Sequence, residues 1–369
     1  MRANTLQAGL LLGLLGQHQA AFCRAAEAHK HARCPDMPPG RITINAYQLY
    51  PENLSWDPVH CQLYLSVLYN SSIGIYHPET KRLQTVSIPG QTLDVSLHVA
   101  GTIWDKHSSL VSSVVTNAFT IRSGGTNISG DNWLNKYDPA EGKFLWQVNL
   151  TAVSRGRYGF FTDVTHDRRG STWVSGAFPG TVLKVDKSGK RVEEWYVPDL
   201  ERVNRTQHGF TGIDSVGDTL LVVDATKGAL FRFDMRDKKG KATPVQVAIT
   251  PVPTIVRSDA MRLPDKYGGR VLLITDQSRG VLVLRSRDTS WRTAEYLGLV
   301  PADGTLPPGS LTAAVSQIGD RIYALPNWFF EPKVPGTFAG NRSTWLILQR
   351  RWSLCCGGVE AIESNLALF

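Results

Sequence analysis

The sequence has few cysteines and lacks the short motifs of several common enzyme classes. Its five cysteines, among 369 residues, have neither the Cys-x-x-Cys spacing of a redox pair nor that of a zinc site. G-x-S-x-G, H-E-x-x-H, G-x-x-x-x-G-K-[ST] and G-x-G-x-x-G are absent. Serine hydrolases with a nucleophile elbow, zincins, P-loop enzymes and dinucleotide-binding enzymes are therefore disfavoured.

Positive charge is spread along the chain rather than gathered in one block. The formal net charge is +8, and its small clusters, Lys238-Lys239-Gly240-Lys241 and Arg350-Arg351, are not interleaved with aromatic residues. Such clusters are typical of solvated turns rather than of a nucleic-acid surface. We therefore expect no nucleic-acid partner.

The only long apolar run is at the N-terminus, and it is too short to span a bilayer. Arg2, the run within Leu6–Gly16 and the small residues that follow have the layout of a secretory signal peptide over 1–26, with an irregular N-terminal segment as the alternative. Six N-x-[ST] sequons, at Asn53, Asn70, Asn127, Asn149, Asn204 and Asn341, add support. We expect a glycosylated, extracellular protein of the secretory pathway. Once Cys23 leaves with the signal peptide, Cys34 and Cys61 become the expected disulfide.

Four segments of the sequence can be superimposed as copies of one repeat. They begin at residues 63, 171, 220 and 271, and each has an apolar strand, a polar turn, an alternating strand and a charged turn. A further short strand precedes each pair, as in "ENLSWD", "FFTDVTHD" and "SDAMRLPD". Six such strands recur at roughly 50 residues, the period of a four-stranded propeller blade. The sequence therefore predicts an all-β, six-bladed β-propeller of four-stranded blades.

The domain limits follow from the repeat. The propeller is predicted over residues 41–345, and 346–369 is an atypical C-terminal tail that does not fit the blade pattern. The strand-like segment 41–50 precedes the first blade, and in propellers such a segment often completes the last blade and covers its edge. The insertion "RSGGTNISGDN" is expected to be a loop over one face.

The first strand of each predicted blade carries polar residues near its start. The equivalent positions are Glu52, His98, Asp163, Thr211, Asp259 and Thr312. In a propeller these strands line the central channel, so the six side chains are expected to face one mouth. Glu52, Asp259 and Asp163 would perturb one another's pKa values and act as catalytic acids or bases. Alternatively, they are hydrogen-bonded channel residues without a catalytic role. For His98 this structural role is the favoured interpretation.

An aromatic run late in the chain offers an apolar wall for a ligand. Asn327, Trp328 and Phe329 lie in "PNWFFEP" and are predicted to bind substrate together with His98, Thr211 and Thr312. The alternative for this run is an ordinary buried strand. Trp56, Trp104 and Trp173 follow the repeat and are expected in the blade core.

The first-strand residues resemble those of the superfamily of senescence-marker, gluconolactonase and luciferin-regenerating propellers. "PENLSWD" is similar to its Glu-bearing motif and "SDAMRL" to its Asp-bearing motif. The resemblance implies a divalent cation in the channel, held by one Glu, one Asp and two Asn. Here the amide positions fall near Thr162 or Asp163 and at Thr211, so two side-chain carbonyls are missing. We expect no cofactor; calcium held by Glu52, Asp163 and Asp259 is the alternative.

A narrower resemblance covers most of residues 41–345. The strings "PENLSWDPVHCQLYLSVLYNSSIGIYHPET" and "TFAGNRSTW" resemble the fungal core trichothecene cluster protein 14 family. The resemblance implies a role in sesquiterpenoid toxin biosynthesis and virulence, as a cofactor-free cyclase that closes an ether ring on a hydroxylated terpenoid. A metal-dependent lactonase and a secreted binding protein without catalysis are the alternatives. We expect a monomer with a small terpenoid substrate and no membrane span.

Overall fold

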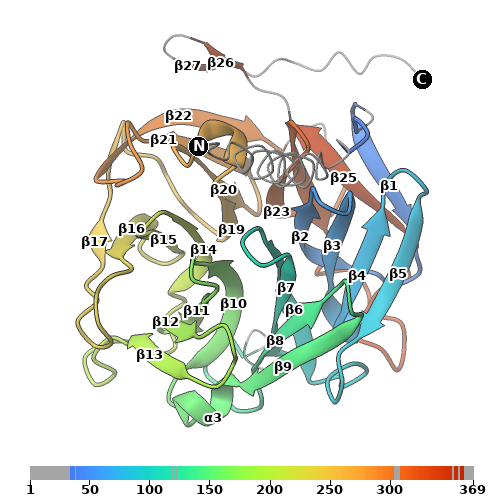
Figure 1. The fold of residues 1–369 in the computed structure, drawn as a ribbon, viewed down its shortest axis with the longest axis horizontal. Helices are drawn as coiled ribbons and strands as arrows, with labels where there is room; N and C mark the ends of the chain where they lie inside the picture. Colours follow the sequence, from blue (N-terminus) through green and yellow to red (C-terminus); the bar gives the residue numbers. More distant parts are fainter. Residues whose placement is uncertain are drawn as a thin grey trace, which may run out of the picture. The chain divides into compact units, whose positions relative to one another are not determined.

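The computed structural model describes residues 34–37, 39–118, 120, 123–302, 308–350, 353–355 and 358–360. The predicted signal peptide at 1–26 lies outside them. Asp36–Phe369 form one compact unit, whose strands build six sheets arranged around a common axis (Figure 1). The first strand of each sheet is nearest the axis. The prediction of an all-β, six-bladed propeller is confirmed.

Blades one to three follow the chain in order, each with four antiparallel strands. Blade one contains β2 (Pro51–Asp57), β3 (Gln62–Val67), β4 (Ser72–His77) and β5 (Arg82–Ser87), with the short 3-10 helix η1 (Leu68–Asn70) between β3 and β4. Blade two contains β6 (Leu97–Asp105), β7 (Leu110–Asn117), β8 (Trp133–Asp138) and β9 (Lys143–Asn149). Blade three contains β10 (Gly159–His166), β11 (Thr172–Phe178), β12 (Gly180–Val185) and β13 (Val192–Tyr196), preceded by α3 (Leu150–Ser154).

Blades four to six repeat the pattern with two modifications. Blade four contains β14 (Phe210–Val216), β15 (Thr219–Asp224), β16 (Ala229–Asp234) and β17 (Val245–Gln246). Blade five contains β19 (Ser258–Arg262), β20 (Val271–Asp276), β21 (Gly280–Arg285) and β22 (Thr293–Pro301), with β18 (Ala248–Thr250) as a fifth strand and η2 (Asp265–Tyr267) in the β19–β20 connection. Blade six contains β23 (Leu311–Ile318), β24 (Arg321–Asn327), β25 (Thr344–Arg350) and β1 (Arg41–Asn45). A separate hairpin pairs β26 (Ser353–Cys355) with β27 (Gly358–Glu360).

The N-terminal strand closes the ring. β1 pairs antiparallel with β25 over five residue pairs, from Arg41 opposite Leu348 to Asn45 opposite Thr344. Because residues from the two ends of the repeat share one sheet, opening the ring would require breaking that sheet. The sixth blade extends to Arg350, past Trp345 and into the segment that the repeat had assigned to the tail.

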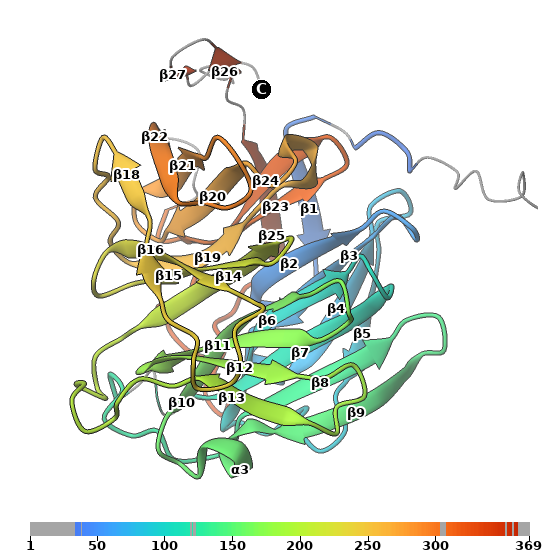
Figure 2. The ribbon, with the colours of Figure 1, turned by 60° about the vertical axis from the view of Figure 1, so that its left-hand side comes forward.

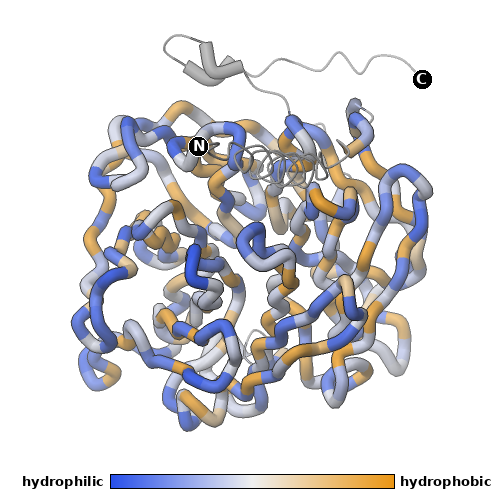
Figure 3. Tube along the Cα trace, viewed as in Figure 1, coloured by the Kyte–Doolittle hydropathy of each residue, from blue (hydrophilic) through white to orange (hydrophobic). Residues whose placement is uncertain are grey.

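The blade cores lie between neighbouring sheets. Six clusters of buried apolar side chains each combine residues of two adjacent blades, for example Leu134 of blade two with Leu183 of blade three. Short apolar and polar stretches alternate along the chain (Figure 3). Strands such as β3 and β20 are buried on both faces, which explains their nearly continuous apolar sequences. Trp173 lies fully buried in one cluster, as the repeat predicts.

The connection from blade four to blade five differs from the repeat. β17 pairs with β16 at the edge of blade four, and the chain then enters β18, which pairs in parallel with β22 at the edge of blade five (Figure 2). Parallel neighbours require a long crossover rather than a hairpin. A two-residue strand and a three-residue strand carry too little alternation to be recognised in the sequence.

All six inner strands share one irregularity. Each has a shift of register in its pairing with the second strand, for example between Pro51 and Leu54 in β2 and between Ser258 and Met261 in β19. A bulge leaves an extra residue out of the ladder and turns its side chain to a new direction. Here the bulges fall in the channel-lining parts of the strands that carry the predicted acids.

Several other expectations concern the surface. Cys61 is disulfide-bonded, and so is Cys34, in agreement with the expected pair. Among the residues that the structure describes, no helix is both long and apolar enough to cross a bilayer. Asn127, Asn204 and Asn341 are exposed, whereas Asn53 is 3 % exposed and hydrogen-bonded inside the channel, so the folded protein leaves no space for a glycan at Asn53.

Candidate functional site

The three predicted acids meet inside the channel, near the ends at which the inner strands begin. Glu52 is on β2, Asp163 on β10 and Asp259 on β19, in blades one, three and five. They are close enough for the charges of Asp259 and Asp163 to raise the pKa of Glu52. The fold therefore brings three carboxyl groups together, although the first and the last, Glu52 and Asp259, are more than 200 residues apart in the sequence.

Glu52 is the least compensated of the three acids. Its side chain is partly buried, and its Oε2 atom is sealed from solvent without a hydrogen-bond partner among the described residues. Burial, followed by the charges of Asp259 and Asp163, raises its pKa well above the ordinary value. A carboxyl group in this environment holds its proton more tightly than an exposed glutamic acid and is suited to act as an acid.

Asp259 lies in a more polar setting than Glu52. Burial raises the pKa of Asp259 to about 6, the hydrogen bond from Gln277 Nε2 at 3.0 Å opposes the rise, and the charge of Asp163 adds to it. At neutral pH this side chain is mainly a carboxylate, which can accept a proton. Two carboxyl groups with separated proton affinities are the arrangement that acid–base catalysis requires.

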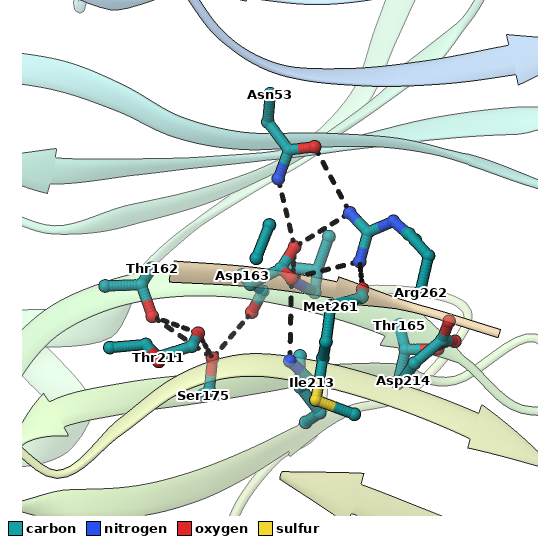
Figure 4. A network of polar contacts seen from close by, with 12 residues as sticks. Asn53, Thr162, Asp163, Thr165, Ser175, Thr211, Ile213, Asp214, Met261 and Arg262 are labelled. Atoms are coloured by element: carbon teal, nitrogen blue, oxygen red, sulfur yellow. Dashed lines mark hydrogen bonds and ion pairs between the residues drawn. The ribbon is translucent and has the colours of Figure 1, made fainter. Parts of the chain in front are cut away.

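Asp163 is held by an arginine that the sequence reading did not single out. Arg262, the last residue of β19, donates from Nη1 to Asp163 Oδ2 at 3.0 Å and from Nη2 to Asp163 Oδ1 at 3.1 Å. Asn53 contacts both partners, and Figure 4 shows the three side chains pointing toward one another. A bidentate, buried ion pair fixes the position and orientation of the Asp163 carboxyl group. Both of its oxygens are therefore occupied by contacts with Arg262 and Asn53.

Arg262 could have been found only weakly from the sequence. It lies three residues after Asp259 in "SDAMRL", where it looks like the polar end of a strand. Its partner is 99 positions away. Only the arrangement of β10 and β19 around the axis brings the two residues together.

The polar groups at this level do not fit a divalent cation. The guanidinium of Arg262 already contacts both carboxylate oxygens of Asp163. Thr162 Oγ1 donates to Thr211 O at 2.8 Å, and Thr211 Oγ1 lies 3.3 Å from Ser258 Oγ, so neither hydroxyl replaces a missing amide ligand. Within the described part of the chain, no group of three or more His, Cys, Asp or Glu side chains is arranged to hold a metal. Calcium needs six to eight oxygen ligands, and the positive charge of Arg262 lies where such an ion would approach Asp163.

The remaining first-strand residues have different surroundings. His98 is 7 % exposed and packs edge-on against Tyr69, with ring centroids 5.0 Å apart, and against Phe338. Thr312 is fully buried, and its Oγ1 has no hydrogen-bond partner among the residues described. An unpaired buried hydroxyl costs free energy unless a ligand or water satisfies it.

Asn327 and Trp328 lie in the core rather than along the mouth. Asn327 is fully buried, donating to Pro51 O at 2.7 Å and accepting from Trp328 N. Trp328 is 2 % exposed and donates to Pro308 O. Their side chains are occupied in joining blade six to blade one, so neither presents a surface to a substrate. Phe329 is partly exposed and packs against the same core.

Other aromatic residues supply apolar surface at this end of the inner strands. Phe178 is stacked on His208 with ring centroids 5.0 Å apart, and Phe160 packs beside Phe178. Gly159 pairs with Phe178 in the sheet, which places this cluster at the start of β10. His208 Nε2 is a further buried atom without a partner in the described residues.

The fold and these residues define a six-bladed propeller whose channel mouth holds two carboxyl groups in different surroundings, Glu52 without a hydrogen-bond partner among the described residues and Asp259 hydrogen-bonded to Gln277. A sequence model of the Mal s 1 allergenic protein-like family matches residues 28–255. Trichothecene biosynthesis protein 14 of Trichoderma arundinaceum is 34 % identical over 308 residues, covering 79 % of this chain and 83 % of that protein. Core trichothecene cluster (CTC) protein 14 of Fusarium sporotrichioides is 31 % identical over 312 residues, covering 80 % and 81 %.

A solved structure agrees at the level of the fold. The crystal structure of the major Malassezia sympodialis allergen Mala s 1 has a TM-score of 0.71 and 21 % sequence identity, covering 85 % of this chain and 96 % of that one. The chain belongs to the Mal s 1-like family, in the group that includes the trichothecene cluster proteins 14. The resemblance to the core trichothecene cluster protein 14 family, predicted from the string that begins "PENLSWDPVH", is thereby confirmed.

Proposed function

We propose that this protein is a cofactor-free tailoring enzyme of trichothecene biosynthesis that closes an ether ring on a hydroxylated sesquiterpenoid at the mouth lined by Glu52 and Asp259. The names of the two fungal relatives support the pathway. The observation that carries the chemistry is the buried, unpaired carboxyl of Glu52, whose pKa is raised by burial and by the charge of the nearby Asp259.

The reaction joins two hydroxyl groups of one molecule and releases water. Asp259 accepts the proton of the attacking hydroxyl while Glu52 protonates the departing one, so a C–O bond forms as another C–O bond breaks. The acid is then restored when Asp259 returns a proton to Glu52 through water. Because both reacting groups belong to one substrate, the protein contributes mainly by holding them in the reactive geometry.

Asp163 and Arg262 set the electrostatics of this reaction. The negative charge of Asp163 favours the protonated form of Glu52, while Arg262 limits that effect by pairing with Asp163. The ring of Phe160, which is partly exposed and packs against the buried Phe178, offers apolar contact to a terpenoid skeleton. Phe160 takes the part that the sequence analysis gave to Trp328.

The test is product formation by purified protein supplied with hydroxylated sesquiterpenoids. Product mass reports the loss of water, and product chirality separates enzymatic closure from a slow uncatalysed one. We expect one stereoisomer, formed equally fast with and without a chelator. Glu52→Gln and Asp259→Asn should abolish the stereoselective product, whereas Asp218→Asn, in an exposed turn far from the acids, should not.

Three results would contradict the proposal. A racemic product at the uncatalysed rate would leave the protein as a binding partner only. Full activity of Glu52→Gln, with unchanged folding, would remove the acid from the mechanism. A rate that collapses on chelation and returns with a divalent ion would favour the metal-dependent alternative.

A further inference from the structure

A second cavity lies at the other end of the inner strands, away from Glu52 and Asp259. It has a volume of about 480 Å³ and is lined by the closing residues of all six inner strands and by the turns that follow them. Its apolar lining consists of Trp56, Ile103, Trp104, Val216, Leu263 and Pro264. A volume of this size suits a small organic ligand. Trp56 and Trp104, expected in the blade core, are partly exposed here instead.

The buried ion pair separates this cavity from the first mouth. Arg262 lines the cavity, while its guanidinium binds Asp163 and Asn53. Asn53 is adjacent to Glu52 on β2, so the network lies between the two acids and the cavity. The two ends of the channel therefore present separate surfaces.

A buried hydrogen-bond chain orients a histidine in the cavity wall. Lys136 Nζ donates to Ser112 Oγ at 3.1 Å, and Ser112 Oγ lies 2.8 Å from His166 Nε2. Since Ser112 accepts from Lys136, its own proton is free to go to Nε2, the nearest acceptor. Burial, and next the charge of Lys136, lower the pKa of His166 to about 3, so the ring is neutral and carries its proton on Nδ1.

The other face of this histidine is available to a ligand. Nδ1 of His166 makes no hydrogen bond to any residue that the structure describes, and the ring lines the cavity. Burial lowers the pKa of Lys136 to about 8, which leaves it mainly charged at neutral pH and keeps the donor chain in place. The wall thus presents a fixed N–H donor among apolar side chains.

The buried charges of the floor and walls already have partners, whereas the exposed Arg168 in the lining forms no ion pair with a described residue. Arg262 is paired with Asp163 and Lys136 with Asp105, and Asp214 accepts from the backbone amides of Leu263 and Ser215 at 2.7 Å each. At the rim, Lys106 bridges to Asp265 at 2.6 Å and so links blades two and five across the opening. An ionic ligand would have to break one of these pairs, whereas an uncharged ligand would not.

One more donor is unsatisfied beside the cavity. Nε1 of Trp104 is buried and lacks a partner within the described residues. Indole N–H groups usually find a partner when buried. Because this atom is sealed from solvent, His166 Nδ1 remains the donor that the cavity wall presents to a ligand.

We propose that this second mouth binds an uncharged, hydroxylated and largely apolar small molecule, which packs on Trp56 and Trp104 and accepts a hydrogen bond from Nδ1 of His166. This binding site is distinct from the site of the reaction, since neither Glu52 nor Asp259 lines the cavity.

The test compares two rigid probes by titration calorimetry and intrinsic tryptophan fluorescence. Cedrol is a tricyclic sesquiterpene alcohol, and cedrene is the corresponding hydrocarbon without the hydroxyl. We expect cedrol to bind the full-length protein with one-to-one stoichiometry and ~3–10-fold more tightly than cedrene, the effect of one net hydrogen bond. In His166→Phe the two probes should bind alike. Glu52→Gln should bind cedrol like the wild type.

Nuclear magnetic resonance of the wild type locates the probe even when a histidine variant folds poorly. Cedrol should shift the indole N–H signals of Trp56 and Trp104, assigned from Trp56→Phe and Trp104→Phe, and leave that of Trp328 in place. The proposal is overturned when neither probe binds, when cedrol binding is lost in Glu52→Gln, or when His166→Phe keeps the preference for cedrol. Signals that move only for tryptophans outside the cavity would overturn it as well.

Discussion

Replacing Arg262 by methionine tests the central ion pair of the channel. Asp163 and Arg262 have side chains 3 % and 12 % exposed, and two hydrogen bonds of 3.0 and 3.1 Å join them. Without Arg262, the carboxylate keeps one short bond, from Val164 N at 2.9 Å, and two long ones, from Asn53 Nδ2 at 3.4 Å and Ile213 N at 3.5 Å. A buried charge is then left largely uncompensated.

The expected loss of stability is large for one substitution. Removing one partner of a buried pair costs about 3–5 kcal/mol of unfolding free energy. Arg262→Met should lose this amount at neutral pH. The double variant Asp163→Asn, Arg262→Met removes both charges and should recover at least half of the loss. Chemical denaturation followed by circular dichroism measures the wild type, Arg262→Met, Asp163→Asn and the double variant.

Two results would refute this reasoning. One is a cost below about 1 kcal/mol for Arg262→Met, the range of an exposed pair. The other is a double variant whose loss equals the sum of the two single losses, since the interaction energy between the residues would then be zero.

Three further predictions follow from the site and the core. The pH profile of kcat/KM should rise near pH 6, where Asp259 loses its proton, and should fall again at higher pH as Glu52 ionises. A rise at or below about pH 4 would contradict the role of Asp259. Trp328→Ala should cost about 3–5 kcal/mol of unfolding free energy because the ring is buried. Phe330 is 78 % exposed, so Phe330→Ala should change the unfolding free energy by less than about 0.5 kcal/mol. Equal effects of the two substitutions would refute the placement of Trp328 in the core. In protein secreted from a eukaryotic host, mass spectrometry should find glycans at Asn127, Asn204 or Asn341 and none at Asn53, and a glycan at Asn53 in folded protein would contradict its burial.

The fold could be predicted because each blade repeats the same local signals. Period-two alternation, charged turns and glycines such as Gly280 recur along the chain, and a Cβ at Gly280 would approach Val300 O to 2.1 Å. The closing role of residues 41–50 also followed from a general property of sheets, since an exposed edge must be covered. β17 and β18 escaped prediction because strands of two and three residues contain no measurable period.

The candidate site was only partly predictable. Glu52, Asp163 and Asp259 were found because they stand at equivalent positions of a repeat, and equivalent positions meet at the axis of a ring. Trp328 was predicted at the mouth from the aromatic run "PNWFFEP" alone, whereas contacts with Pro308 and the neighbouring core bury it. The cavity beside His166 had no signal at all, because its residues come from the far ends of six different strands.

The sequence alone determined the blades, their number and the strands that carry acids, because these depend on local periodicity and on its repetition. Tertiary structure decided which acid is free to act. Glu52 and Asp163 look alike in the sequence, yet a guanidinium from a distant strand binds Asp163, and burial without a partner raises the pKa of Glu52. Charges and desolvation act through space, so the chemistry of a carboxyl group is fixed only when its neighbours are in place.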